Sequence, residues 1–166
     1  VQLNFYYKND PEIIDNWKAL QPITAELLKF FNKNIGTYPY KQYSVVQGGD
    51  GGMEYSMLTL VNSGKDFVPL VSVTSHELAH AWFQGVLATN EMNHEWMDEG
   101  SASFFGDLAE SFVLGSDFNN SIMSSYGRYI SLANSGQEMP QSTNANRYKH
   151  NLSLIHISEP TRPTLI

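Results

Sequence analysis

The chain has no cysteine, few basic residues and no long apolar run. Without cysteine it can contain neither a disulfide framework, nor a thiolate zinc site, nor a cysteine nucleophile. Its 10 basic and 17 acidic side chains give a net charge of −7, which argues against a nucleic-acid partner bound through its phosphates. An acidic surface suits a cationic substrate, although most acidic proteins simply gain solubility from it. No apolar stretch is long enough to span a membrane, so no membrane segment is expected in this chain.

The size of the chain fits one hydrophobic core. With 166 residues, 42% of them hydrophobic, we expect one domain or a piece of a larger one, and we favour the piece. The sequence begins with Val1 instead of methionine, and residues 1–7 have the composition of a strand that arrives from an earlier segment. No signal peptide is visible, and the residues by themselves leave the compartment and the oligomeric state open.

The most informative motif is His76-Glu77-Leu78-Ala79-His80, within a helix predicted over residues 71–86. Residues four apart lie on the same helix face, so His76 and His80 can direct two imidazoles at one point, with Glu77 beside them. A motif of this form arises by chance in roughly one chain of this length in a few hundred. The pattern therefore predicts a site for one Zn²⁺ with a general base next to it.

Two histidines leave a catalytic zinc site short of one protein ligand, usually a carboxylate. Glu99 supplies it, within a second helix predicted from Trp96 to Leu108. Eighteen residues separate His80 from Glu99, enough for the first helix to end and a second to cross it. The predicted ligands are therefore His76, His80 and Glu99, with one coordination position left for water or substrate.

Two other polar residues near this motif are weaker candidates. His94 lies in the connecting loop, but the predicted site already has three ligands, so we do not assign it to the metal. Ser103 follows Glu99 by one helical turn and is a candidate to orient that carboxylate.

A glycine-rich segment over residues 48–52 precedes a predicted strand over residues 53–61. Such a segment suggests a phosphate-binding loop, but those loops open a helix whose N-terminus faces the phosphate. Because this one opens a strand, we reject a nucleotide site. The glycines instead allow the backbone to approach a ligand closely, since they carry no Cβ.

Three segments together resemble the aminopeptidase N-type zinc metallopeptidases, which are gluzincins with a thermolysin-like catalytic domain. They are HELAHAWF from His76, the Trp-x-x-Glu-Gly of residues 96–100, and Gly-Gly-Met-Glu-Tyr at residues 51–55. The resemblance extends over about residues 5–151 and is greatest to bacterial members. It implies an α+β, mainly helical fold: part of a thermolysin-like catalytic domain with a small mixed sheet at the active-site cleft.

The resemblance also implies roles for individual residues. The strand edge at Gly51, Gly52 and Met53 would pair with the substrate backbone, and Glu54 would hold the free α-ammonium of a peptide. A downstream tyrosine would donate a hydrogen bond to the developing oxyanion. Tyr148 is the last candidate, but it precedes the expected position, so the catalytic tyrosine is expected to be missing. A periplasmic or secreted location is slightly favoured.

The same resemblance divides the chain into three parts. Residues 1–8 would be the exit strand or linker from a missing N-terminal β-domain, and residues 9–151 part of the peptidase catalytic domain. Residues 152–166 contain two prolines within four residues and resemble a translated sequencing adapter. We expect that tail not to be native.

Two further helices are predicted from apolar spacing. The first begins with Asp10 as N-cap and Pro11 at its first position, is kinked or split at Pro22, and ends at Gly36; a short strand over residues 43–47 follows it. The other covers residues 119–133. Its helical pattern uses the apolar residues Ile122, Met123, Tyr126, Tyr129 and Ile130; the predicted core residues of the Glu99 helix are Phe104, Phe105 and Leu108.

The predicted function is removal of N-terminal residues from peptides by a metal-activated water, with Glu77 as the base. The chain itself would be inactive if the catalytic tyrosine is missing. One alternative is a thermolysin-type zinc endopeptidase, which shares the ligands but has no use for Glu54. The other is a zinc-binding scaffold without activity, against which the intact Glu77 argues.

Overall fold

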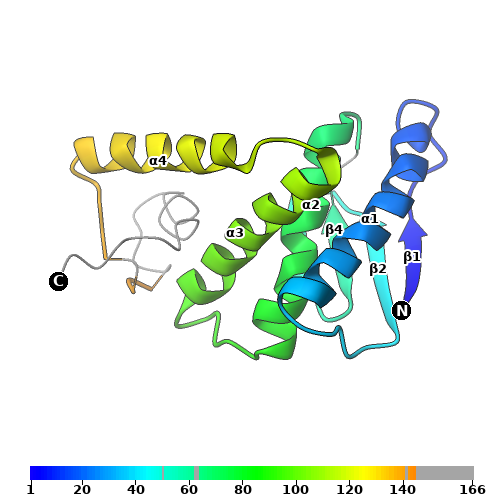
Figure 1. Ribbon diagram of the computed structural model, residues 1–166, viewed down its shortest axis with the longest axis horizontal. Coiled ribbons are helices and arrows are strands. Elements are labelled where there is room, and N and C mark those ends of the chain that lie inside the picture. Colours follow the sequence, from blue (N-terminus) through cyan, green and yellow to red (C-terminus); the bar gives the residue numbers. More distant parts are fainter. Residues whose placement is uncertain (50, 62–63, 141, 145–166) are drawn as a thin grey trace.

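A computed structural model describes residues 1–49, 51–61, 64–140 and 142–144 (Figure 1). It consists of one small mixed sheet, helices packed against it, and a last helix that extends away from them (Figure 1). This confirms the predicted α+β, mainly helical class. Tyr148 and the predicted non-native tail, residues 152–166, lie outside the described residues. The elements in chain order are β1 (Gln2–Tyr6), α1 (Ile14–Asn34), β2 (Gln42–Gln47), β3 (Gly52–Tyr55), β4 (Leu58–Val61), α2 (Phe67–His80), the π-helix η1 (Ala81–Val86), α3 (Glu95–Leu114) and α4 (Phe118–Asn134).

The sheet has the strand order β1-β2-β4-β3. β1 pairs with β2, and β2 with β4, in parallel, whereas β3 pairs with β4 in the antiparallel direction. Parallel neighbours require a crossover connection, and α1 provides the one between β1 and β2. β1 pairs along its whole length, from Gln2 to Tyr6, so it belongs to this sheet; its predicted link to another domain stays a prediction.

The single strand predicted over residues 53–61 is wrong. The segment forms a hairpin, in which β3 and β4 are joined at Ser56 and Met57. Met57 has a φ of 60°, a left-handed conformation that sequence rules assign to glycine or asparagine. The turn therefore has no sequence signal. It makes β3 the edge strand and leaves Glu54 opposite Thr59 on β4.

The first helix is continuous, and the predicted split at Pro22 does not occur. Pro22 and Lys18, whose carbonyl loses its helical hydrogen-bond partner, are both exposed, so water can satisfy that carbonyl. The helix also begins later than predicted, because Asp10 caps a preceding turn: its Oδ1 accepts from the backbone N–H of Glu12 at 2.9 Å. The inner face carries Trp17, Leu20, Leu27 and Phe31, all fully buried.

α2 is the central element, with the sheet on one side and α3 on the other (Figure 1). It begins at Phe67, before the predicted start, and the last six residues of the predicted helix, Ala81–Val86, are π-helical. The crossing with α3 is close, since a Cβ on Gly106 would lie 3.0 Å from the Cα of His76. Small residues of α3 make this contact, so its predicted core residues Phe104, Phe105 and Leu108 are only half-buried.

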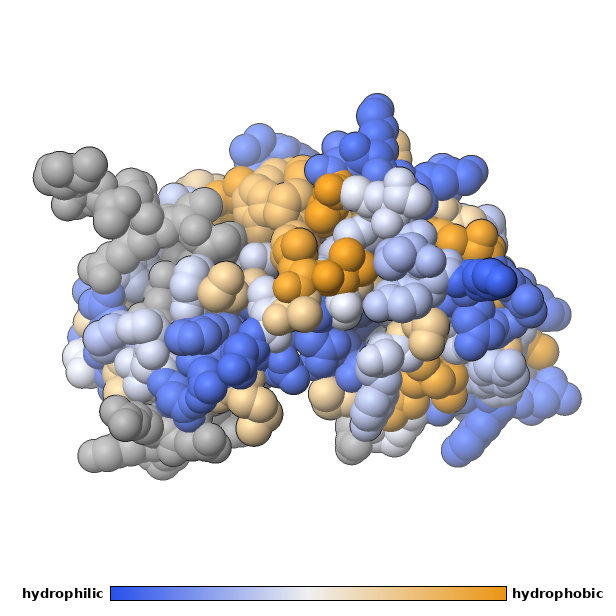
Figure 2. Space-filling model, turned by 90° about the horizontal axis from the view of Figure 1, so that it is seen from below, coloured by the Kyte–Doolittle hydropathy of each residue, from blue (hydrophilic) through white to orange (hydrophobic). Residues whose placement is uncertain are grey.

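α4 is confirmed as a helix, but much of its apolar pattern is exposed. Of its residues, Leu132 is buried, while Met123 and Ile130 are 68% and 55% exposed. Contact with α3 comes at its N-terminal end, where the rings of Phe118 and Phe104 lie 5.5 Å apart. Figure 2 shows apolar areas at the surface, separated by hydrophilic ones. None of the helices formed by the described residues has the length and apolarity needed to cross a bilayer.

Candidate metal centre

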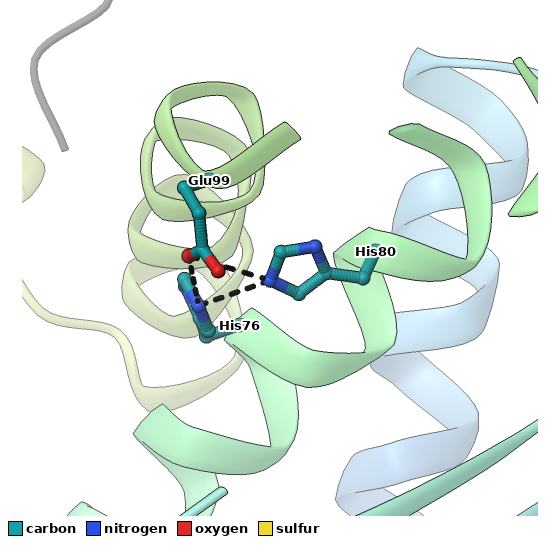
Figure 3. Close-up of side chains that lie close together, drawn as sticks. All are labelled: His76, His80 and Glu99. Atoms are coloured by element: carbon teal, nitrogen blue, oxygen red, sulfur yellow. Dashed lines mark hydrogen bonds and ion pairs between the residues drawn. The ribbon is translucent and has the colours of Figure 1, made fainter. Parts of the chain in front are cut away.

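The two motif histidines of α2 and Glu99 of α3 point toward one another (Figure 3). The Nε2 atoms of His76 and His80 are 3.2 Å apart. Glu99 Oε2 lies 3.3 Å from the first nitrogen and 3.6 Å from the second. Helical geometry places the two histidines one turn apart, and the close crossing of α2 and α3 brings the carboxylate to them.

This triangle of donor atoms fits a zinc ion. Zinc–nitrogen bonds of about 2.0–2.1 Å in a tetrahedral arrangement place neighbouring ligand atoms about 3.3–3.4 Å apart. The three distances here, 3.2, 3.3 and 3.6 Å, match that spacing. The donor set of two imidazoles and one carboxylate is also typical of catalytic zinc sites.

The electrostatics of the metal-free cluster favour positive charge at its centre. Burial alone would lower the pKa of His80, but hydrogen bonds with Asp98 and Glu99 outweigh it and raise the pKa to about 10. For Glu99, burial acts to raise the pKa. Its hydrogen bonds with His76 and His80 outweigh burial and hold the pKa well below the ordinary value. The carboxylate is therefore ionised and available as a ligand.

Asp98 is a residue of this centre that sequence reasoning missed. Its Oδ1 lies 2.7 Å from His80 Nδ1, and the two side chains are 2% and 1% exposed. A proton on Nδ1, donated to Asp98, leaves Nε2 free to bind a metal. Ser103, the predicted partner of Glu99, makes no hydrogen bond with it within the described part of the chain. The signal for Asp98 was its position directly before the third ligand.

Glu77, which follows His76 directly in the motif, has a buried side chain. Burial raises its pKa to about 7, although His76 and His80 act in the opposite direction. Its Oε2 atom has no hydrogen-bond partner among the described residues, and a buried acceptor of this kind usually binds water or a ligand. On its other side, a Cβ on Gly52 would overlap Oε1. Glu77 is thus a carboxyl group suited to taking up a proton near neutral pH.

The edge strand β3 borders the same site. Carboxylate oxygens of Glu54 and Asp98 and a ring nitrogen of His80 lie within 4.8 Å of one another, and burial raises the pKa of Glu54. Gly51 and Met53 are exposed beside it. The predicted substrate-binding residues at the start of β3 are therefore next to the predicted ligands.

His94, which we did not assign as a ligand, lies elsewhere. It precedes the first residue of α3 and is exposed. Among the described residues, the two groups with suitable metal-binding spacing are His76, His80 and Glu99, and Glu54, His80 and Asp98. Neither includes His94.

No family model matches the chain. It is similar to aminopeptidase N from Oryctolagus cuniculus, with 33% identity over 106 residues, and from Rattus norvegicus, with 33% over 110 residues. These matches cover 55% and 57% of this chain and 11% of each relative. Glutamyl aminopeptidase from Rattus norvegicus is 27% identical over 94 residues, covering 57% of this chain and 10% of that protein. The chain thus spans about a tenth of these relatives.

The fold is that of a solved metallopeptidase. The crystal structure of the M1 zinc metallopeptidase from Deinococcus radiodurans matches with a TM-score of 0.60 and 23% identity, covering 81% of this chain and 30% of that one. A mutant of the same enzyme gives a TM-score of 0.61, with 83% and 31% covered. The sequence is thus similar to part of the aminopeptidase N relatives, and the fold to part of an M1 zinc metallopeptidase, in line with the resemblance to the aminopeptidase N-type zinc metallopeptidases.

Proposed function

We propose that the chain contributes the metal ligands and the base of a zinc-dependent aminopeptidase, which removes N-terminal residues from peptides. The observation that carries the proposal is the convergence of His76, His80 and Glu99, at 3.2 to 3.6 Å. Beside them lies Glu77, whose Oε2 has no partner in the described part of the chain. One Zn²⁺ held by these three residues would polarise the scissile carbonyl and activate a water for attack.

Glu77 acts as the general base in this proposal. With a pKa raised to about 7 by burial, it accepts the proton of the attacking water and passes it to the leaving amine. Its Oε2, which makes no hydrogen bond to any residue that the structure describes, provides the acceptor. A positioned base typically contributes a factor of about 10² to 10⁴ in rate.

Glu54 distinguishes an aminopeptidase from an endopeptidase. Its half-buried carboxylate on β3 lies close enough to the metal centre to hold a free α-ammonium while the first peptide bond is at the metal. The partly desolvated pair of carboxylate and ammonium would be strong. The substrate partner is therefore a peptide with a free N-terminus. The three relatives are aminopeptidases by name, which supports this choice.

Turnover also needs a donor for the oxyanion, whose removal typically costs about 10² to 10³ in rate. Tyr148 stays the candidate within this chain, and it lies outside the described residues. If neither Tyr148 nor another group of this chain supplies the donor, the chain binds zinc without hydrolysing peptides.

The test combines bound zinc with hydrolysis of aminoacyl nitroanilides. We expect about one zinc per chain, lost on replacing His80 by Ala and retained in His94→Ala. Where hydrolysis is measurable, Glu77→Gln should abolish it with zinc retained. Absence of zinc from the unaltered chain would refute the proposal. If the chain binds zinc but hydrolyses no substrate, and still hydrolyses none after it is extended with a relative's downstream segment, the result would favour a zinc-binding scaffold without activity.

Glu54→Ala separates the two kinds of peptidase. An aminopeptidase should lose far more activity on free-amino substrates than on N-blocked ones. Equal losses on both, or a preference of the unaltered enzyme for blocked peptides, would instead favour the thermolysin-type endopeptidase. Glu12→Ala, a change at an exposed residue that pairs with Lys65, is the matched control and should alter neither activity.

A further inference from the structure

Two consecutive residues of α3 hold the two nitrogens of one imidazole. Asp98 Oδ1 lies 2.7 Å from Nδ1 of His80, and Glu99 Oε2 lies 3.6 Å from its Nε2. Successive residues on a helix point about 100° apart, so Asp98 turns into the protein interior while Glu99 lies on a more exposed side of α3. The ring of His80 lies between them.

The inner contact is the more buried of the two. The side chains of Asp98 and His80 are 2% and 1% exposed, against 27% for Glu99. A buried carboxylate is costly unless it is paired, and here the histidine nitrogen is the partner. The same bond orients the ring so that Nε2 faces His76 Nε2 and Glu99 (Figure 3).

We infer that Asp98 is a positioning residue of the metal centre, which keeps the proton of His80 on Nδ1 and strengthens the bond between Nε2 and a divalent metal ion through its negative charge. This inference rests on the proposed zinc site. It assigns two separable contributions to Asp98: the hydrogen bond, which an amide oxygen can also accept, and the charge, which an amide lacks.

The fold offers a control for a purely structural role. Ser75 Oγ donates to the backbone carbonyl of Gly106 at 2.8 Å, so the same two helices are also tied at a buried point that does not involve His80. Since α2 and α3 are held at more than one place, replacement of Asp98 should leave them packed. Ser75→Ala weakens the packing without touching the ring of His80.

The experiment measures zinc affinity by competition with a chelator, in the full 166-residue chain, for the variants Asp98→Asn, Asp98→Leu and Ser75→Ala. Asp98→Asn should bind zinc roughly 10- to 100-fold more weakly, and Asp98→Leu more weakly still. Ser75→Ala should lower the unfolding temperature of the metal-free chain and leave the affinity within about threefold. Circular dichroism of the metal-free variants reports whether each is folded.

A second readout is the visible spectrum of the Co²⁺-loaded protein, which should shift in Asp98→Asn and be unchanged in Ser75→Ala. If zinc affinity and the cobalt spectrum of Asp98→Asn match those of the unaltered chain, Asp98 has only a structural role and the inference is overturned. Should Asp98→Leu fail to fold, Asp98→Asn decides alone. If the unaltered chain binds no zinc, the proposed function fails as well, which is a different result.

Discussion

The crossing of α2 and α3 differs sharply from α4, although the sequence predicts helices in both regions. At the crossing, Ala102 and Ala109 are fully buried, and Gly106 approaches the backbone of His76. On α4, by contrast, Met123 and Ile130 are largely exposed. An apolar stripe therefore predicts that a helix forms, but not that another element of the chain covers it. The closely packed region is therefore the one that carries the predicted metal ligands.

The largest expected effect is the loss of a core side chain next to the predicted metal ligands. Leu78 is fully buried in α2, so Leu78→Ala should lower the free energy of unfolding by about 2–5 kcal/mol. Ile130→Ala on α4, at 55% exposure, should change it by less than about 0.5 kcal/mol. Urea unfolding of both variants measures the contrast, and similar losses would show that α4 is covered in solution.

Glu77→Gln should change the pH dependence of the free energy of unfolding, because Glu77 is buried in the closely packed region around α2. Burial raises the pKa of Glu77 from 4.5 to about 7, so the folded chain binds more protons than the unfolded one between these values. The stability of the metal-free chain therefore falls as pH rises through this window, on the order of 3 kcal/mol at most. Because glutamine cannot ionise, the free energy of unfolding of the variant should rise relative to that of the original chain as the pH increases from about 4.5 to about 7. Above that pH the difference should stay constant. The measurement is the free energy of unfolding of both proteins after chelator treatment, as a function of pH. If the difference between them does not change with pH, Glu77 is not desolvated in the folded chain.

Gly106→Ala tests the closeness of the crossing. The new Cβ would lie 3.0 Å and 3.2 Å from the Cα and N of His76, and backbone atoms cannot move aside as a side chain does. We expect a loss of about 1–3 kcal/mol in unfolding free energy, together with weaker zinc binding because His76 shifts. Denaturation and chelator competition measure the two effects, and an unchanged affinity would mean that the crossing tolerates expansion.

The smallest expected effect, that of Gly127→Ala, is a gain in stability instead of a loss. Gly127 lies inside α4 and is exposed, and apart from its own stretch of helix no atom of the described residues lies within 4 Å of an added Cβ. Gly127→Ala should therefore stabilise the chain by about 0.5–1 kcal/mol through helix propensity. A loss of stability in the same unfolding assay would indicate that this face of α4 packs against something.

Sequence reasoning located the predicted ligands because helical geometry leaves little freedom. Four-residue spacing brings His76 and His80 together wherever the helix lies, and a carboxylate on the next helix completes the set. It missed Asp98, since spacing alone does not tell which of two adjacent carboxylates turns inward. It also missed the β3–β4 turn, because the left-handed residue there is Met57 instead of glycine.

Helix ends and interiors were harder to predict for a related reason. The rule that proline breaks a helix assumes that the freed carbonyl has no other partner, and at Pro22 the solvent-facing position removes that difficulty. The π-helical turn after His80 has no sequence pattern of its own. In each case tertiary surroundings decided what local preference left open.

The contact between Gly52 and Glu77 has a consequence for attempts to redesign the proposed active site. Because the carboxylate of Glu77 occupies the space of the missing side chain, any larger residue introduced at Gly52 to alter substrate choice would also reorient the proposed base. Libraries that vary the edge strand would therefore sample selectivity and rate together. Diversity is better introduced at Met53, whose side chain is 40% exposed.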